Sequence, residues 1–181
     1  MNVKEQNIVT KKKRVLLVID MQNDFIDGAL KNTEAMAIID NVNAKIAEYR
    51  NAGDIVVFTR DTHNEDYLNT VEGKNLPVPH CIKGTEGWKI SSKIDVCDDK
   101  IIDKPTFGSL ELADYVDTLD IDEIELIGVC TDICVISNAM IIKARFPEKE
   151  ISVDSACCAG VTPKTHNNAL EAMKMCHIKI S

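Results

Sequence analysis

The stretch that decides the fold is Val15-Leu16-Leu17-Val18-Ile19-Asp20, five apolar residues followed by a carboxylate. A short apolar run of this kind is typical of a strand that is buried on both faces of a parallel sheet. Further short runs rich in Val and Ile follow along the chain, at 55–58, 100–103, 124–127, 151–153 and 178–180. The sequence therefore predicts about six strands.

Helical patterns separate these runs. Apolar residues recur at helical spacing between Ala35 and Ile46, and Gly53 is placed to cap that helix at its C-terminal end. Three more helices are predicted, over 110–119, 133–144 and 163–175, the last with Thr162 as its N-cap. The alternation of strands and helices predicts the α/β class, as a three-layer α/β/α domain with a mostly parallel sheet.

Length, charge and cysteine content narrow the possible functions. A chain of 181 residues fits one domain, expected over residues 14–181 after a solvated tail at residues 1–13. The net charge of -8 argues against nucleic-acid binding, and no apolar run approaches the roughly 20 residues of a membrane span. Seven cysteines without an export signal indicate reduced thiols in a cytoplasmic protein. We therefore expect a small-molecule partner, with neither nucleic acid nor membrane involved.

Polar residues follow the predicted strands at the edge where ligands bind in open α/β sheets. Asp20 ends the first run, Lys104 ends the third, and Cys134 follows the fourth. A thiol with its reference pKa of about 8.5 needs a base and a nearby cation to react as a thiolate, and Asp and Lys supply both. Each residue alone could be a helix cap, a solvated charge or a core thiol, but the set predicts an activated cysteine nucleophile.

Two cysteines lie close together after the fourth run. Cys134 falls in or near the first turn of the predicted helix, where backbone N–H groups lower a thiol pKa and can hold an oxyanion. Cys130 lies in the preceding turn, which suits backbone donation. Their CxxxC spacing differs from the CxxC of dithiol oxidoreductases, so the sequence favours Cys134 as a nucleophile over a redox pair.

A second group of polar residues lies in and beside the long segment 62–92, which shows no period and is therefore expected to be functional. Asp61 and His63 are two apart on an extended segment and point to the same side, while Glu72 and His80 follow further along. Oxygen and nitrogen ligands of this kind predict a site for a divalent metal, Zn²⁺, Fe²⁺ or Mn²⁺. His166 and His177 are interpreted as structural or surface residues.

Five segments together resemble a known family, the isochorismatase-like cysteine hydrolases, and most closely its nicotinamidase/pyrazinamidase branch. The motifs occur in family order over nearly the whole chain, at 15–25, 61–63, 79–87, 103–107 and 128–135. The resemblance implies a flavodoxin-like fold and a catalytic triad of Asp20, Lys104 and Cys134. It also implies a cis peptide before Cys130 and an oxyanion hole made by the backbone N–H groups of Cys130 and Cys134.

The activity implied by this resemblance is hydrolysis of nicotinamide to nicotinate and ammonia through a thioester on Cys134. The family's metal ligands correspond to Asp61, His63 and His80, with Glu72 matching a fourth ligand of some members. Phe25 resembles an aromatic wall of the substrate pocket. Family members commonly assemble into dimers or tetramers, so a homo-oligomer is expected as well.

Two positions depart from the nicotinamidase pattern. Many nicotinamidases have Trp where this chain has Thr62, and an aromatic residue where this chain has Pro77. A lost ring face removes roughly 0.5 to 1.5 kcal/mol of aromatic pairing, which weakens nicotinamide binding without forbidding it. Two alternatives therefore stay open: a metal-free cysteine hydrolase of another amide, ureido or carbamoyl compound, and a noncatalytic binding module on the same fold.

Overall fold

The structure is a computed structural model that describes residues 12–181. Most of the predicted tail at 1–13 lies outside the described residues. Lys13 already contacts the body of the protein, because its backbone carbonyl accepts hydrogen bonds from the N–H groups of Asp122 and Glu123.

Six parallel strands form one sheet, in the order β3-β2-β1-β4-β5-β6. They are β1 (Arg14–Ile19), β2 (Ile55–Asp61), β3 (Lys100–Lys104), β4 (Glu123–Val129), β5 (Glu150–Ala159) and β6 (Lys179–Ile180). Residues 15–19 of β1 are completely buried at the centre of the sheet. The α/β class and the number of strands predicted from the sequence are confirmed.

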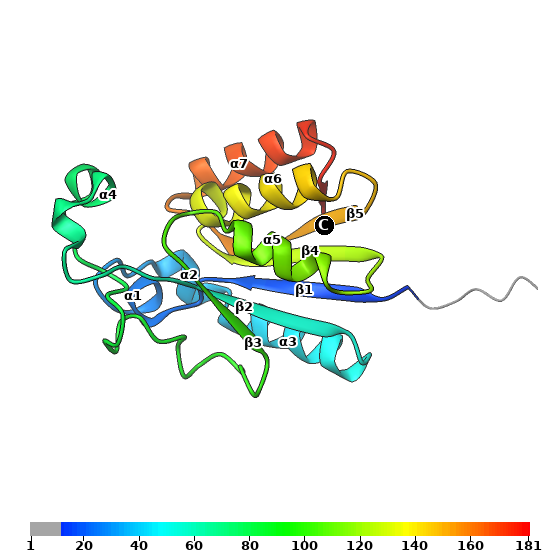
Figure 1. Cartoon of the computed structure of the whole chain (residues 1–181), viewed down its shortest axis with the longest axis horizontal. Coiled ribbons are helices and arrows are strands. Elements are labelled where there is room, and N and C mark those ends of the chain that lie inside the picture. The colour runs from blue at the N-terminus through cyan, green and yellow to red at the C-terminus, as the bar shows by residue number, and fades with distance from the viewer. Residues whose placement is uncertain (1–11) are drawn as a thin grey trace, which may run out of the picture.

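Helices cover both faces of the sheet. α3 (Ile39–Asn51) lies on one face, while α5 (Leu110–Asp117), α6 (Ile136–Arg145) and α7 (Pro163–Met175) lie on the other (Figure 1). The short elements near the carboxyl edge of the sheet are α1 (Asn23–Ile26), α2 (Thr33–Ala37), a 3-10 turn at Tyr67–Asn69, α4 (Val71–Asn75) and a π-helical turn at Thr131–Val135. In the described part of the chain, no helix is long and apolar enough to span a bilayer.

Several predicted elements need correction. The single helix expected around Ala35 to Ile46 is two helices that meet at Ile38, which ends α2 and precedes α3. Asn32 caps the start of α2 by accepting from the N–H of Glu34. The helix expected over 133–144 starts earlier, as the π-helical turn that runs into α6. The helix expected to reach residue 119 ends at Asp117.

The fifth strand is longer than its apolar run. The pairing of β4 with β5 changes register between Leu126 and Gly128, so that β5 continues through polar residues and bulges before it ends. Cys157 and Cys158 are part of this longer strand, and both are buried.

The sheet reverses its order between β1 and β4, which is the position where open α/β sheets form their ligand crevice. The two backbones come very close there. A Cβ added to Gly128, whose φ is +115°, would lie 2.2 Å from the carbonyl oxygen of Ile19. Glycine is required at this position, because it adopts the positive φ without strain and has no Cβ to collide with the β1 backbone.

Candidate active site

Four strand ends bring the predicted catalytic and metal-binding side chains to one edge. Asp20 follows β1, Asp61 ends β2, Lys104 ends β3, and Cys134 lies in the turn after β4. These four strands are neighbours in the sheet, in the order β3-β2-β1-β4. Because all four run parallel, their carboxyl ends meet, and the structure places the predicted residues in contact.

Lys104 is the centre of the catalytic group. Its ammonium Nζ lies 2.6 Å from Oδ2 of Asp20 and 3.5 Å from Sγ of Cys134. It also donates to the backbone carbonyl of Thr106 at 3.1 Å. The other carboxylate oxygen of Asp20 accepts a hydrogen bond from the Thr59 hydroxyl at 2.6 Å. Asp20 and Lys104 are completely buried, so their charges interact without screening by water.

Burial dominates the protonation of this group. It raises the pKa of Cys134 well above its ordinary value, and this effect outweighs the positive charge of Lys104, which acts in the opposite direction. Burial also raises the pKa of Asp20, although Lys104 opposes that shift. The lowered thiol pKa expected from the helix N-terminus is therefore wrong, because burial raises the pKa of Cys134.

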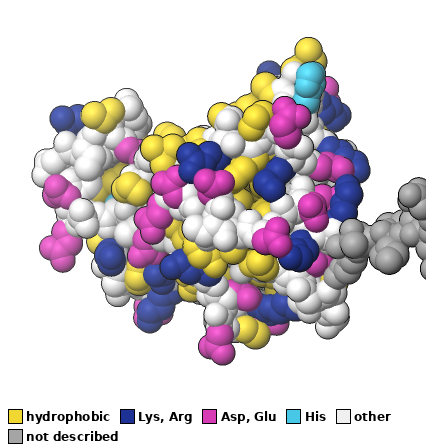
Figure 2. Space-filling model, turned by 45° about the vertical axis from the view of Figure 1, so that its right-hand side comes forward, with side chains coloured by type: hydrophobic (Ala, Val, Ile, Leu, Met, Phe, Trp, Pro, Cys, Tyr) yellow, Lys and Arg dark blue, Asp and Glu magenta, His cyan; other side chains and the backbone are white. Residues whose placement is uncertain are grey.

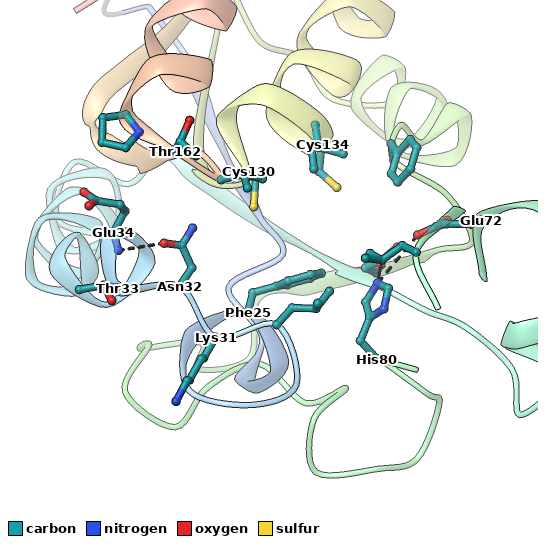
Figure 3. A pocket seen from close by; sticks show the side chains of 17 residues that line it. Phe25, Lys31, Asn32, Thr33, Glu34, Glu72, His80, Cys130, Cys134 and Thr162 are labelled. Atoms are coloured by element: carbon teal, nitrogen blue, oxygen red, sulfur yellow. Dashed lines mark hydrogen bonds and ion pairs between the residues drawn. The ribbon is translucent and has the colours of Figure 1, made fainter. Parts of the chain in front are cut away.

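The turn that holds Cys134 is fixed from several sides. The peptide bond between Val129 and Cys130 is cis, as the family resemblance implies. The carbonyl of Cys130 accepts hydrogen bonds from the N–H groups of Ile133 and Val135, both at 3.0 Å. These bonds close the π-helical turn around Cys134, which points toward the cavity beside Cys130 (Figure 3).

Asn138 is a buried residue that the sequence did not single out. Its amide nitrogen donates to the carbonyl of Cys134 at 2.8 Å and to that of Phe107 at 3.1 Å. Its amide oxygen accepts from the N–H of Ser109 at 3.0 Å. Asn138 thus ties the turn of the nucleophile to the segment that follows Lys104.

His166 has a specific structural contact. Its Nδ1 lies 2.8 Å from the hydroxyl of Thr131, the first residue of the π-helical turn. The carboxylate of Asp132 accepts from the N–H of Val161 at 3.1 Å. The start of α7 therefore holds the same turn at two points.

The predicted metal ligands Asp61, His63, Glu72 and His80 also come together, with one ligand atom from each within 4.8 Å of the others. Nε2 of His63 lies 3.0 Å from Asp61 and 3.5 Å from Glu72. Nε2 of His80 lies 3.6 Å and 3.8 Å from the same two carboxylates.

The orientation of His80 fits a metal ligand. Its Nδ1 donates to the carbonyl of Val78 at 2.8 Å, which turns Nε2 toward the two carboxylates. Although burial opposes ionisation of Asp61, hydrogen bonds from His63 and His80 hold the pKa of this carboxyl well below its usual range. Two imidazoles and two carboxylates, one of them ionised, form a donor set suited to Zn²⁺, Fe²⁺ or Mn²⁺.

Two more residues hold the loops of this group, and neither role could be predicted from the sequence. The side chain of Gln22 accepts from the N–H of Asp61 at 2.6 Å and donates to the carbonyl of the same residue at 2.9 Å. Asp24 accepts from the N–H of Cys81 at 2.8 Å. Gln22 therefore fixes the backbone of Asp61, while Asp24 fixes the loop beside His80.

A cavity of about 550 Å³ opens beside both groups. Phe25, Asp61, His80, Cys130 and Cys134 are among its lining residues. Phe25 lies across the cavity from the two cysteines (Figure 3), the place expected for an aromatic wall. The cavity therefore gives a small molecule access to the thiol and to the predicted metal ligands at once.

Known proteins resemble the chain in sequence and in fold. The chain is 26% identical to the nicotinamidase/pyrazinamidase of Mycobacterium tuberculosis, with 92% of this chain and 97% of that protein covered. The pyrazinamidase of Pyrococcus horikoshii in complex with zinc is 30% identical, with a TM-score of 0.82 over 93% of this chain and 98% of that one. The nicotinamidase/pyrazinamidase of Bacillus subtilis is 27% identical, with a TM-score of 0.81 over 93% and 99%. Residues 14–181 match the isochorismatase domain, and the chain is a member of the isochorismatase family of hydrolases.

Proposed function

We propose that this protein is a cysteine-dependent amidohydrolase of the nicotinamidase type, which converts nicotinamide and water to nicotinate and ammonia. The observation that supports this most directly is the position of Lys104, which contacts Asp20 at 2.6 Å and Cys134 at 3.5 Å beside the cavity. A buried carboxylate, ammonium and thiol in mutual contact are the groups that acyl transfer to a thiol requires.

The first half of the reaction forms a thioester. Asp20 takes the proton of the Cys134 thiol, whose raised pKa keeps it protonated until substrate binds. The thiolate attacks the amide carbonyl, and the backbone N–H groups of Cys130 and Cys134 stabilise the oxyanion. Asp20 then gives its proton to the departing ammonia. The ammonium of Lys104 stays charged, because the negative charges of the neighbouring carboxylates outweigh the effect of burial on its pKa.

The second half of the reaction releases the product. With Asp20 ionised again, it takes a proton from a water molecule that attacks the thioester carbonyl. The bond between the acyl carbon and Sγ breaks, the acid leaves, and the proton returns to Cys134. A carboxylate with a raised pKa suits this role, because it must both accept and donate a proton near neutral pH.

Asp61, His63, Glu72 and His80 would hold a divalent metal ion beside this centre, and zinc is present in the similar pyrazinamidase of Pyrococcus horikoshii. When bound, such an ion would act as a Lewis acid toward a ring nitrogen of the substrate. Within the protein itself, His63 and His80 keep Asp61 ionised, and Gln22 fixes the backbone that presents it.

Ammonia release from nicotinamide tests the proposal. The parent protein should release ammonia, and Cys134→Ala should lose at least about 10³-fold in kcat, because the thioester can no longer form. Thr118→Ala is a matched control, since that hydroxyl caps the end of α5 far from the cavity. Unchanged activity in Cys134→Ala would contradict the mechanism.

The metal-free alternative is tested separately. For a nicotinamidase with bound metal, a chelator or His80→Ala should lower activity strongly. If the protein hydrolyses a ureido or carbamoyl compound in place of nicotinamide, and keeps that activity both with the chelator and in His80→Ala, it is the alternative hydrolase. A protein that turns over no amide and no ureido or carbamoyl compound would be a binding module on this fold.

A further inference from the structure

The cavity is larger than a single-ring amide requires. A ring carboxamide displaces about as much volume as four or five water molecules, roughly 150 Å³ at about 30 Å³ each. The cavity holds about 550 Å³, which lies in the range of roughly 300 to 1,000 Å³ that larger ligands occupy. Most of its volume therefore lies beyond the space that nicotinamide itself would fill.

The additional space extends away from the predicted metal ligands. His80 and Glu72 lie on one side of the cavity, and Asn32, Glu34 and Thr162 lie on the opposite side, with the two cysteines and Phe25 between them (Figure 3). A substrate carbonyl placed at Cys134 can therefore carry an acyl group that reaches past the catalytic group toward the starts of α2 and α7.

The walls of this outer half offer apolar contact. Leu30, Ile133, Val161 and Pro163 line it. Val161 is 55% exposed, a large value for an aliphatic side chain at the edge of a cavity. On the side nearer α4, Phe107 and Leu76 line the cavity and are 41% and 39% exposed. Hydrophobic side chains are visible on both sides of the hollow between the α4 segment and the body (Figure 2).

Among the polar residues in the same half, Asn32 and Thr162 already have partners within the protein. The amide of Asn32 accepts from the N–H of Glu34 at 2.9 Å and donates to the carbonyl of Gly160 at 2.8 Å. The hydroxyl of Thr162 accepts from the N–H of Thr165 at 3.1 Å as the cap of α7. The ammonium of Lys31 is directed away from the cysteines (Figure 3).

The two departures from the nicotinamidase pattern add no ring to this space. The hydroxyl of Thr62 accepts from the indole N–H of Trp88 at 2.8 Å and donates to the carbonyl of Arg60 at 3.0 Å. Among the described residues that line the cavity, neither Thr62 nor Pro77 is present. These positions therefore do not narrow the cavity around a single ring.

We propose that the preferred substrate is a primary amide whose acyl part carries an uncharged, apolar extension, which lies against Leu30, Ile133 and Val161. This inference rests on the proposed amidohydrolase function and defines its substrate class. An anionic extension fits less well, because burying an unpaired charge against these side chains costs free energy. Asn32 and Thr162 already have partners, and the carboxylate of Glu34 lines the same side of the cavity.

A series of substrates tests the proposal. Nicotinamide is compared with homologues that carry methyl to pentyl groups at the ring carbon meta to both the carboxamide and the ring nitrogen. A fully buried methylene contributes about 0.8 kcal/mol, or about fourfold in affinity, so kcat/KM should rise about twofold to fourfold for each methylene until the chain reaches solvent. A flat or falling series would overturn the proposal.

Two variants locate the effect. Val161→Asp places a charge in the outer half and should reduce the gain of the pentyl homologue over nicotinamide at least fivefold. Leu110→Asp introduces the same charge at a residue that is 73% exposed but does not line the cavity, and should leave the series unchanged. Equal effects of the two variants would contradict the proposal. A change in the oligomeric mass of Val161→Asp without an effect on the substrate series would also contradict the proposal. Val161 would then lie against a second copy of the chain and not against the substrate.

A binding measurement separates this inference from the proposed function. Titration calorimetry of the same series against Cys134→Ala needs no turnover. If no compound is hydrolysed but the Kd falls twofold to fourfold per methylene, the amidohydrolase proposal fails and the apolar outer site stands. If nicotinamide is hydrolysed but the Kd values do not fall along the series, the function stands and the substrate class proposed here is wrong.

Discussion

Removal of the Lys104 ammonium should expose how strongly the buried charges depend on one another. Lys104→Met keeps most of the aliphatic side chain but leaves Asp20 and Asp61 without the cation that lies 2.6 Å and 3.3 Å from them. Removing one partner of a buried ion pair costs about 3 to 5 kcal/mol, because the remaining charge is buried without compensation. We expect the free energy of unfolding to fall by about that amount at neutral pH.

The double variant Lys104→Met with Asp20→Asn is the matched test. Because it removes the uncompensated charge as well, it should recover at least half of the lost stability. Urea unfolding measures both, as a shift in the midpoint with an unchanged m value. A loss below about 1 kcal/mol in the single variant, or a double variant as unstable as the single one, would refute the reasoning.

The stability of Lys104→Met relative to the parent protein should also depend on pH. Burial raises the pKa of Asp20, and Lys104 opposes this shift, so loss of Lys104 raises the pKa further. The folded variant then binds a proton more tightly than the folded parent protein does, and its deficit in stability should shrink as the pH falls. A deficit that grows on acidification would contradict the assignment to Asp20.

Three further predictions concern Asn138, Gly128 and the predicted metal ligands. Asn138→Ala leaves three backbone groups without their partner, two of them in buried hydrogen bonds, and should cost about 2 to 4 kcal/mol in urea unfolding. Asn41→Ala, which breaks one exposed bond to the carbonyl of Ala156, should cost less than about 1 kcal/mol. Gly128→Ala should lower Tm by roughly 5 to 15 °C in calorimetry, because its Cβ would lie 2.2 Å from a β1 carbonyl oxygen. Zinc at a hundredfold excess over its Kd should stabilise the parent protein by about 2.7 kcal/mol, and His80→Ala should lose most of this gain; an equal gain in both proteins would argue against the metal site.

The meeting of the proposed catalytic residues could be predicted from the sequence because each residue follows a buried apolar run. Parallel strands bring their carboxyl ends to one edge, so the positions of Asp20, Lys104 and Cys134 along the chain were enough to predict that they meet. Gln22 and Asn138 gave no such signal. Both act on backbone groups of other segments, such as the peptide of Asp61, 39 residues away in the chain from Gln22.

The chemical state of the thiol could not be predicted from local sequence either. A helix start at Cys134 favours a lowered pKa, but the packing of the whole sheet edge around the residue raises it.

The length of β5 could not be predicted either, because polar residues in its middle interrupt the apolar run. Asp154 is tolerated there because Lys45, from α3, pairs with it at 2.9 Å.

The protonated, buried state of Cys134 also bears on how the protein withstands oxidants and electrophiles. Peroxides and alkylating agents react with exposed thiolates, and Cys134 is 5% exposed and held as a thiol. Cys176 and Cys97 are exposed, and Cys97 donates a hydrogen bond to Asp95, which raises its own pKa. Adventitious damage should therefore begin at Cys176, on the far end of α7, and spare the thiol on which turnover would depend.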